Sequence, residues 1–311
     1  MSTHSVRREK VLITGGTGLL GLSLIQNAPR NYDIFATYHR FPTKILPDFS
    51  NCKYISLDVT DKKNVMKLFK KNKPKYLIHT ASIGSVDFCE QHKKEAFKIN
   101  VLGGRNMIEA CKKYDTKIIY TSSNAVFDGK NPPYKESDQT KPLDYYGKTK
   151  LQTEKDILKN NIKYCIVRLM TMYGWNHCNE RPNPVTWLLD ELKNNRQVKV
   201  VDDIYNNHLY VKDAAKAIWQ IIKKNKSKIY HLAGPKTISR FDLSLNVAKT
   251  FKLNQNLIQP VDSSFFPSLA PRPKDTTYQI NKMIKELGVK PMSPLKGLLD
   301  MKKNQPSWKK S

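Results

Sequence analysis

A tyrosine and a lysine four residues apart stand in the segment "LDYYGKTKLQTE" (143–154). The segment holds two tyrosines and two lysines, but only Tyr146 and Lys150 have the spacing that places two side chains on one face of a helix. Tyr145 lies three residues before Lys148, so it lacks that partner. A nearby ammonium favours the phenolate, so we predict that Lys150 lowers the pKa of Tyr146 and makes it a proton donor or acceptor near neutral pH.

A hydroxyl group about twenty residues upstream gives this pair a substrate oxygen to act on. Taken alone, the Y-x-x-x-K pattern is weak, because tyrosine and lysine are both common in this chain. The segment "YTSSNAVFDG" (120–129) begins as an apolar strand and ends in hydroxyl side chains. We therefore predict that Ser123 binds the carbonyl or hydroxyl oxygen of the substrate.

A glycine-rich loop near the start of the chain predicts a dinucleotide site. "LITGGTGLLG" places Gly15, Gly18 and Gly21 in a G-x-x-G-x-x-G spacing, after an apolar strand and at the start of a helix. Such a loop permits a tight turn, close approach of the backbone to a pyrophosphate, and an anion at the helix N-terminus.

The end of the second predicted strand distinguishes the two nicotinamide cofactors. An NAD enzyme usually places Asp or Glu there to hold the ribose hydroxyls. This chain has "TYHR", in which His39 and Arg40 could face a 2′-phosphate, so NADP(H) is preferred while NAD(H) stays possible. The ends of two further strands are expected along the cofactor, at the residues Asp58, Val59, Thr80, Ala81 and Ser82.

The elements that must position these groups alternate between strand and helix over the first 234 residues. Short apolar runs predict strands at 10–14, 33–38, 53–59, 75–81, 116–123, 163–170 and 228–234. Helical spacing of apolar residues appears between most of them, as in 62–72, where Val65, Leu68 and Phe69 share a face. This alternation predicts an α/β, Rossmann-type doubly wound parallel sheet.

A change of pattern after Tyr173 predicts a second, smaller lobe. Residues 235–311 contain many prolines and are expected to be irregular. We predict an NAD(P)-binding domain at 1–174, to which 200–234 returns. The substrate-binding lobe is expected at 175–199 and 235–311.

Composition narrows the class of protein. No run of about 18 apolar residues and no signal-peptide pattern occurs, so a cytoplasmic protein without membrane contact is expected. The net charge of +27 raises the alternative of nucleic-acid binding. Most of the 54 basic residues are lysines scattered along the chain, so we expect no specific nucleic-acid site and a general attraction to anionic ligands instead. The five cysteines form no CxxC, so neither a metal site nor a disulfide framework is indicated.

The chain resembles an extended short-chain dehydrogenase/reductase and, within that group, the dTDP-4-dehydrorhamnose reductase (RmlD-like, sugar-nucleotide-binding) family. The matching segments run through nearly its whole length. They are "ITGGTGLLG", "ASIGSVDFCE", "INVLG", "YTSSNAVFDG", "PYKESDQTKPLDYYGKTKLQTE", "VRLMTMYG", "VVDDIYNNHLYVKDAAKAI", "YHLAG" and "LAPRPKDTTYQINK".

The resemblance implies a role for each matching residue. It implies that Ser123 polarises the substrate oxygen, that Tyr146 is the general acid, and that Lys150 binds the ribose. Further cofactor contacts are implied at Leu19, Leu20, Asn100 and Thr121, and substrate contacts at Asn124, Ala125, Thr171 and Arg272.

Departures from the family pattern leave the substrate open. The family usually has Asp and Tyr after the catalytic hydroxyl, where this chain has Asn124 and Ala125, and Thr171 stands near the place of a tryptophan.

The activity implied is NADPH-dependent reduction of a 4-keto-6-deoxy nucleotide sugar, as in dTDP-rhamnose biosynthesis. The alternatives are a nucleotide-sugar epimerase with tightly bound NAD, or a non-catalytic subunit like the beta subunit of methionine adenosyltransferase. A nucleotide-sugar substrate is the expected partner, and a homodimer is possible.

Overall fold

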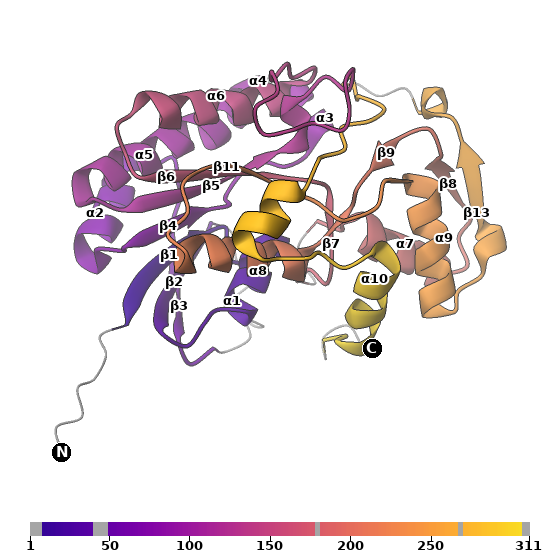
Figure 1. Cartoon of the computed structure of the whole chain (residues 1–311), viewed down its shortest axis with the longest axis horizontal. Helices are drawn as coiled ribbons and strands as arrows, with labels where there is room; N and C mark the ends of the chain where they lie inside the picture. The colour runs from indigo at the N-terminus through magenta and orange to yellow at the C-terminus, as the bar shows by residue number, and fades with distance from the viewer. Residues whose placement is uncertain (1–7, 40–48, 178–180, 267–269, 307–311) are drawn as a thin grey trace.

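The computed structural model describes residues 8–39, 49–177, 181–266 and 270–306, and its centre is a parallel β-sheet (Figure 1). Seven strands pair in the order β11-β6-β5-β4-β1-β2-β3, and each neighbouring pair is parallel. Their bounds are β1 Glu9–Thr14, β2 Tyr32–Tyr38, β3 Cys52–Ser56, β4 Tyr76–His79, β5 Lys117–Ser123, β6 Tyr164–Leu169 and β11 Lys228–Leu232. The predicted α/β class and the predicted doubly wound parallel sheet are therefore confirmed.

Successive residues of the strands pack on opposite faces of the sheet. In β1, Ile13 belongs to one hydrophobic core and Leu12 to the other. In β5, Ile119 and Ile118 divide in the same way. Burial on both faces explains why these strands read as continuous apolar runs rather than alternating ones.

Helices cover both faces of the sheet. Helices α2, α5 and α6 contribute to one core, while α1 and α8 contribute to the other, as Figure 1 shows. In α2, the predicted apolar face is buried, including Val65 and Phe69. The helix bounds are α1 Leu19–Gln26, α2 Lys62–Asn72, α3 Val86–Gln91, α4 Lys93–Phe97, α5 Gly103–Tyr114, α6 Tyr145–Lys159, α7 Pro184–Lys193, α8 Val211–Lys223, α9 Arg240–Phe251 and α10 Pro294–Lys303.

The C-terminal part is more regular than the sequence suggested. Helices α9 and α10 pack together beside a two-stranded parallel sheet of β8 and β13, so the expectation of an irregular segment at 235–311 is wrong for much of it. Helix α9 begins with a reciprocal capping box between Ser239 and Asp242. The remaining strands are β7 Met172–Tyr173, β8 Val198–Val201, β9 Tyr205–Asn206, β10 Leu209–Tyr210, β12 Ile238–Ser239 and β13 Ile258–Val261. The division into two domains stays a prediction.

No helix among the described residues is both long and apolar enough to cross a membrane.

Candidate active site

A cavity of about 2370 Å³ lies at the carboxyl ends of the sheet strands and extends to α7, α9 and the strand pair β8/β13. In open α/β sheets, ligands bind outside the carboxyl ends where the strand order reverses. Here β1 stands between β2 and β4, so the reversal falls beside the glycine loop that follows β1. The volume exceeds the ~300–1,000 Å³ of a typical small-molecule site, so it accommodates a dinucleotide and a second ligand together.

Nearly all of the predicted site residues line this one cavity. They are Gly15, Gly18, Leu19, Leu20, Gly21, His39, Asp58, Val59, Thr80, Ala81, Ser82, Thr121, Ser123, Asn124, Ala125, Tyr146, Lys150, Thr171 and Arg272. Arg40, the residue expected to face a 2′-phosphate, lies outside the described residues. Asn100 is described but does not line the cavity.

The glycine loop makes a backbone cradle that side chains would fill. Gly15 has a φ of +66°, and a Cβ placed on it would lie 2.8 Å from Thr80 Oγ1. A Cβ on Gly21 would lie 2.2 Å from the Gly15 carbonyl oxygen, so only glycine permits this contact between helix and loop. Helix α1 follows directly, and its N-cap, Gly18, supplies no side-chain cap to the first backbone N–H groups. These groups can therefore receive an anionic ligand.

The end of β2 carries no carboxylate among its described residues. Strand β2 ends at Tyr38, and His39 follows with its Nδ1 4.0 Å from Asp58 Oδ2. Asp58 in turn accepts a hydrogen bond of 2.8 Å from the backbone N–H of Thr60. The acidic group near this part of the cavity thus comes from the loop after β3 and not from β2.

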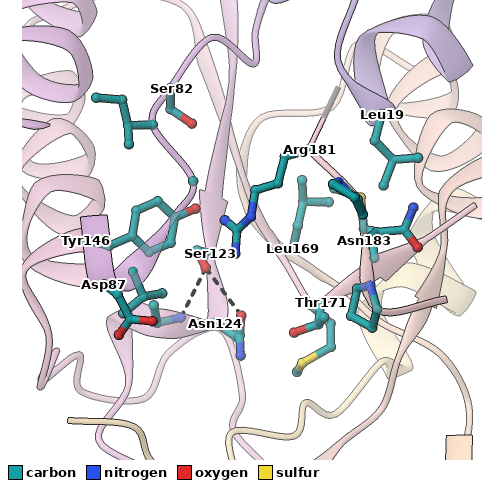
Figure 2. Close-up of a pocket in the computed structure, with 18 of the residues that line it drawn as sticks. Leu19, Ser82, Asp87, Ser123, Asn124, Tyr146, Leu169, Thr171, Arg181 and Asn183 are labelled. Atoms are coloured by element: carbon teal, nitrogen blue, oxygen red, sulfur yellow. Dashed lines mark hydrogen bonds between the residues drawn. The ribbon is translucent and has the colours of Figure 1, made fainter. Parts of the chain in front are cut away.

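The N-terminus of α6 is held against the end of β5, and this contact brings Tyr146 beside Ser123. Asp144 caps the helix, because its Oδ1 accepts a 2.7 Å hydrogen bond from the Gly147 N–H. A Cβ on Gly147 would lie 2.1 Å from the carbonyl oxygen of Ala125, so glycine is required for this close approach. Figure 2 shows the ring of Tyr146 pointing into the cavity next to Ser123.

Tyr145 lies on the other side of this helix turn. Its backbone N–H donates to Glu90 Oε2 at 3.0 Å, and the ammonium of Lys93 lies 5.7 Å from its ring centroid. It does not line the cavity. The contacts therefore agree with the choice of Tyr146 that the helical spacing predicted.

Ser123 ends β5 with its hydroxyl already oriented. Its Oγ accepts a hydrogen bond of 3.2 Å from the Ala125 N–H and donates one of 3.3 Å to Asn124 Oδ1. The Asn124 amide in turn donates to Thr276 Oγ1 at 2.7 Å. Asn124 thus links the end of the sheet to the C-terminal lobe.

Burial is the largest influence on the pKa values of Tyr146 and Lys150. Burial raises the pKa of Tyr146 to about 12, and its hydrogen bond with Ser123 opposes that rise only in part. Burial also lowers the pKa of Lys150 to about 8. The expectation that Lys150 brings the pKa of Tyr146 toward neutrality is therefore wrong for this structure. The Lys150 ammonium lies 5.8 Å from the Tyr146 ring centroid and donates instead to Ser82 Oγ at 3.5 Å.

Asn100 joins two elements of the site without lining the cavity itself. It lies in a short π-helical turn, Lys98–Leu102, between α4 and α5. Its Oδ1 accepts from the Ile83 N–H at 2.8 Å, and its Nδ2 donates to Thr149 Oγ1 at 3.1 Å. Its side chain therefore ties the loop after β4 to helix α6, and the contact of Asn100 with the cofactor stays a prediction.

Three arginines line the other side of the cavity, and sequence reasoning found only one of them. Arg272 is paired with Asp87 of α3, across the cavity from its own segment. Arg181 precedes α7 and Arg240 opens α9. No spacing rule singles out Arg181 or Arg240 in the sequence, because the other residues that line the cavity come from distant segments.

Arg240 has a buried donor without a partner. Its Nε is enclosed and makes no hydrogen bond among the described residues. Burial, and then the neighbouring cations Arg272 and Arg181, lower the pKa of Arg240. Concentrated positive charge with an unsatisfied N–H is stabilised by an anion, so this wall of the cavity is suited to a phosphate-bearing ligand.

Comparisons with known proteins agree over almost the whole chain. The family described as RmlD substrate binding domain matches residues 9–304. The dTDP-4-dehydrorhamnose reductase of Aggregatibacter actinomycetemcomitans is 30% identical over 91% of this chain and 94% of that protein. Methionine adenosyltransferase 2 subunit beta of Bos taurus is 26% identical over 94% of this chain and 86% of that protein. The crystal structure of dTDP-4-dehydrorhamnose reductase from Bacillus anthracis in complex with NADP superposes with a TM-score of 0.85 at 27% identity, covering 96% of this chain and 100% of that one.

Proposed function

We propose that this protein, which belongs to the RmlD substrate binding domain family, is an NADPH-dependent reductase of a 4-keto-6-deoxy nucleotide sugar. The observation that carries the proposal is the meeting of Ser123, Tyr146 and Lys150 with the glycine loop in one cavity. Two proteins similar to it are dTDP-4-dehydrorhamnose reductases, which are oxidoreductases that act on a nucleotide sugar.

The chemistry of the proposed site follows from the two hydroxyl groups. The Ser123 and Tyr146 residues both line the cavity in which a keto oxygen would lie. Tyr146 can donate a hydrogen bond to that oxygen, and Ser123 can do so when its hydroxyl turns from Asn124 Oδ1 to the substrate. With a pKa of about 12, Tyr146 keeps its proton at neutral pH and is a proton donor there. The proton passes from Tyr146 to the alkoxide oxygen as reduction proceeds.

The cofactor is proposed to lie along the residues at the carboxyl ends of β1 to β4. The first turn of α1 receives the pyrophosphate, and Lys150 and Ser82 hold the nicotinamide ribose. When bound, the nicotinamide supplies the hydride. The proposal of NADPH rests on the absence of a carboxylate in the described part of the β2 end and on Arg40, which follows His39.

The proposal is tested by offering the purified chain a panel of keto sugar nucleotides with NADPH or NADH. We expect loss of the nicotinamide absorbance with a 4-keto-6-deoxy sugar nucleotide, and faster loss with NADPH.

The variant Arg40→Ala should weaken NADPH binding far more than NADH binding, because only NADPH carries the 2′-phosphate. Equal losses for the two cofactors would remove the phosphate-binding role of Arg40. Retained NAD without net turnover would favour the epimerase instead.

Arg240, whose Nε is buried and makes no hydrogen bond among the described residues, is proposed to bind the diphosphate of the nucleotide sugar. Replacing Arg240 by Met should raise the KM for the sugar nucleotide by ~10–100-fold and change kcat little, because a charge-assisted hydrogen bond contributes about 1.5–3 kcal/mol. NADPH binding should stay unchanged. The matched control is Arg105→Met, since Arg105 is exposed, pairs with Asp156, and neither residue lines the cavity. A loss of kcat with unchanged KM in Arg240→Met would contradict the assignment.

A second candidate function is that of a partner subunit without its own turnover. The observation in its favour is the similarity to methionine adenosyltransferase 2 subunit beta over most of the chain. A stable complex with a second enzyme, whose activity is the same with Tyr146→Phe as with the original chain, would support this candidate. The proposed reductase predicts that the same variant loses activity.

We also propose the division into two domains that the sequence pattern predicted. The cofactor would bind to 1–174 with the returning segment 200–234, and the sugar nucleotide to 175–199 and 235–311.

A further inference from the structure

Arg181 lies between β7 and α7 and lines the cavity, and specific contacts hold the described residues near it. The indole N–H of Trp175 donates to the carbonyl of Met301 in α10 at 2.7 Å. The Asn176 amide donates to the carbonyl of Arg181 itself at 3.3 Å. Asn183 caps α7 and also donates to the Gly174 carbonyl at 2.8 Å. These contacts hold the Arg181 carbonyl and the described residues Trp175, Asn176 and Asn183 in place.

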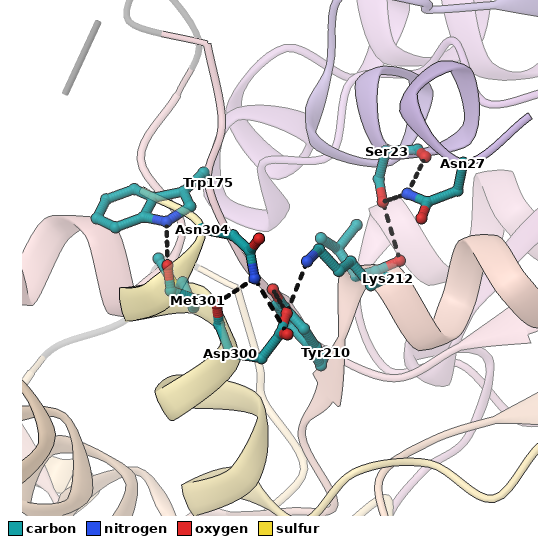
Figure 3. A network of polar contacts seen from close by, with 9 residues as sticks. Ser23, Asn27, Trp175, Tyr210, Lys212, Asp300, Met301 and Asn304 are labelled. Carbon is teal, nitrogen blue, oxygen red and sulfur yellow. Dashed lines mark hydrogen bonds and ion pairs between the residues drawn. The ribbon is translucent and has the colours of Figure 1, made fainter. Parts of the chain in front are cut away.

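Helix α10, which receives Trp175, is itself anchored to the sheet. Asp300 accepts hydrogen bonds from the Tyr210 hydroxyl at 2.9 Å and from the Lys212 ammonium at 2.7 Å, as Figure 3 shows. The Tyr173 hydroxyl donates to the Pro294 carbonyl at 3.3 Å. Helix α10, which binds Trp175, is therefore connected to β7, to β10 and to the start of α8.

The Arg181 side chain points toward the hydroxyl groups of the site. Figure 2 shows it extending across the cavity toward Ser123 and Tyr146. Among the described residues, no ion pair or hydrogen bond engages its guanidinium. Arg272, by contrast, is paired with Asp87. The guanidinium of Arg181 is therefore a cation available to a group that becomes negative in the cavity.

Other groups around Tyr146 differ from Arg181 in their effect on its pKa. Burial raises the pKa of Tyr146 most, and Cys89 of α3 and Asp144 at the N-cap of α6 raise it further, whereas Arg181 lowers it. Tyr120 and Tyr278, both buried, also interact with Tyr146 electrostatically. The Lys150 ammonium lies 5.8 Å from the centroid of the Tyr146 ring, and burial lowers the pKa of Lys150 to about 8.

We infer that Arg181 is a further catalytic residue, whose guanidinium stabilises the negative charge that Tyr146 and the substrate oxygen share during proton transfer. This inference rests on the proposed reductase function. Hydride addition to the keto carbon moves the carbonyl π electrons onto oxygen. The oxygen then takes the phenolic proton, and Tyr146 is left as a phenolate facing Arg181. A cation placed where charge develops lowers the barrier of such a step.

The test measures the phenol directly and does not need turnover. A 3-fluorotyrosine is incorporated at position 146, and its ionisation is followed by fluorine NMR. Replacing Arg181 by Met should raise the titration midpoint by ~1 pH unit or more, because a cation near a phenol favours the phenolate. Arg181→Lys should recover much of the shift. The control Lys148→Met removes an exposed cation of the same helix that does not line the cavity, and should leave the midpoint in place.

Kinetics separate this role from binding of the diphosphate. With a keto sugar nucleotide and NADPH, Arg181→Met should lower kcat by ~10–100-fold and change KM by less than ~3-fold. An unchanged midpoint together with a raised KM alone would overturn the inference and assign Arg181 to the diphosphate with Arg240. If the unaltered chain reduces no keto sugar, the proposed function fails, while the NMR titration still decides whether Arg181 acts on Tyr146.

Discussion

Tyr146→Phe is expected to lower kcat for reduction of the keto sugar nucleotide by ~100-fold or more, with NADPH binding nearly intact. The substitution removes the only atom of the side chain that can give a proton. The ring should stay in place, because α6 is positioned by the Asp144 cap and by the Gly147 contact with Ala125 rather than by the phenol oxygen. Steady-state kinetics and a fluorescence titration with NADPH measure the two quantities separately.

Tyr145→Phe is the matched control for this experiment. It removes the same atom from the adjacent residue, which faces Glu90 and Lys93 outside the cavity. We expect kcat within about twofold of the unaltered chain, because exposed substitutions away from a site have small effects. Equal losses in the two variants would show that the assignment of the proton donor to Tyr146 is wrong.

The second large effect concerns the buried ion pair of Glu154 and Arg168. Their side chains are 1% and 5% exposed, and three hydrogen bonds join them: Nε donates to Oε1 at 3.0 Å and to Oε2 at 3.3 Å, and Nη2 donates to Oε2 at 2.8 Å. Removing one partner leaves an uncompensated buried charge, and an arginine cannot lose its proton. Glu154→Leu should therefore lower the free energy of unfolding by about 3–5 kcal/mol, as measured by urea denaturation.

The double variant Glu154→Leu/Arg168→Met tests whether the buried charge is the cause. It removes both charges and keeps similar volume, so its free energy of unfolding should lie much closer to that of the unaltered chain. Lys163→Met, which breaks an exposed pair with Asp115, should cost no more than about 1 kcal/mol. A double variant as unstable as Glu154→Leu would show that packing, and not charge, is responsible.

Local signals in the sequence were sufficient to predict the parallel sheet and the site residues on the glycine loop and at the strand ends. The strands of the sheet are buried on both faces, so their apolar runs are visible without knowledge of their neighbours. The glycine loop is recognisable from its G-x-x-G-x-x-G spacing, although the steric need at Gly15 is set by Thr80, which follows β4 far along the chain. The choice of Tyr146 over Tyr145 needed only the helical repeat.

The pKa of Tyr146 was harder to predict from the sequence, because it depends on how deeply the folded chain buries the side chain. Spacing correctly put Lys150 beside the Tyr146 ring, but it suggested a pKa for Tyr146 close to neutral. Desolvation in the folded chain has the opposite effect and raises the pKa to about 12. No property of the segment 143–154 by itself reveals how much water the fold removes from these side chains.

The sequence by itself predicted the parallel sheet, the glycine loop and the helix that pairs Tyr146 with Lys150, because each has a local pattern: alternating strand and helix, glycine spacing, and the helical repeat. Only the tertiary structure decided that Arg181 and Arg240 line the same cavity as Tyr146, and which groups Asn100 contacts. Trp175, which precedes Arg181, binds α10 more than a hundred residues further along the chain, and Asn183, which follows Arg181, binds the Gly174 carbonyl. Contacts between segments so distant leave no local pattern from which to predict them.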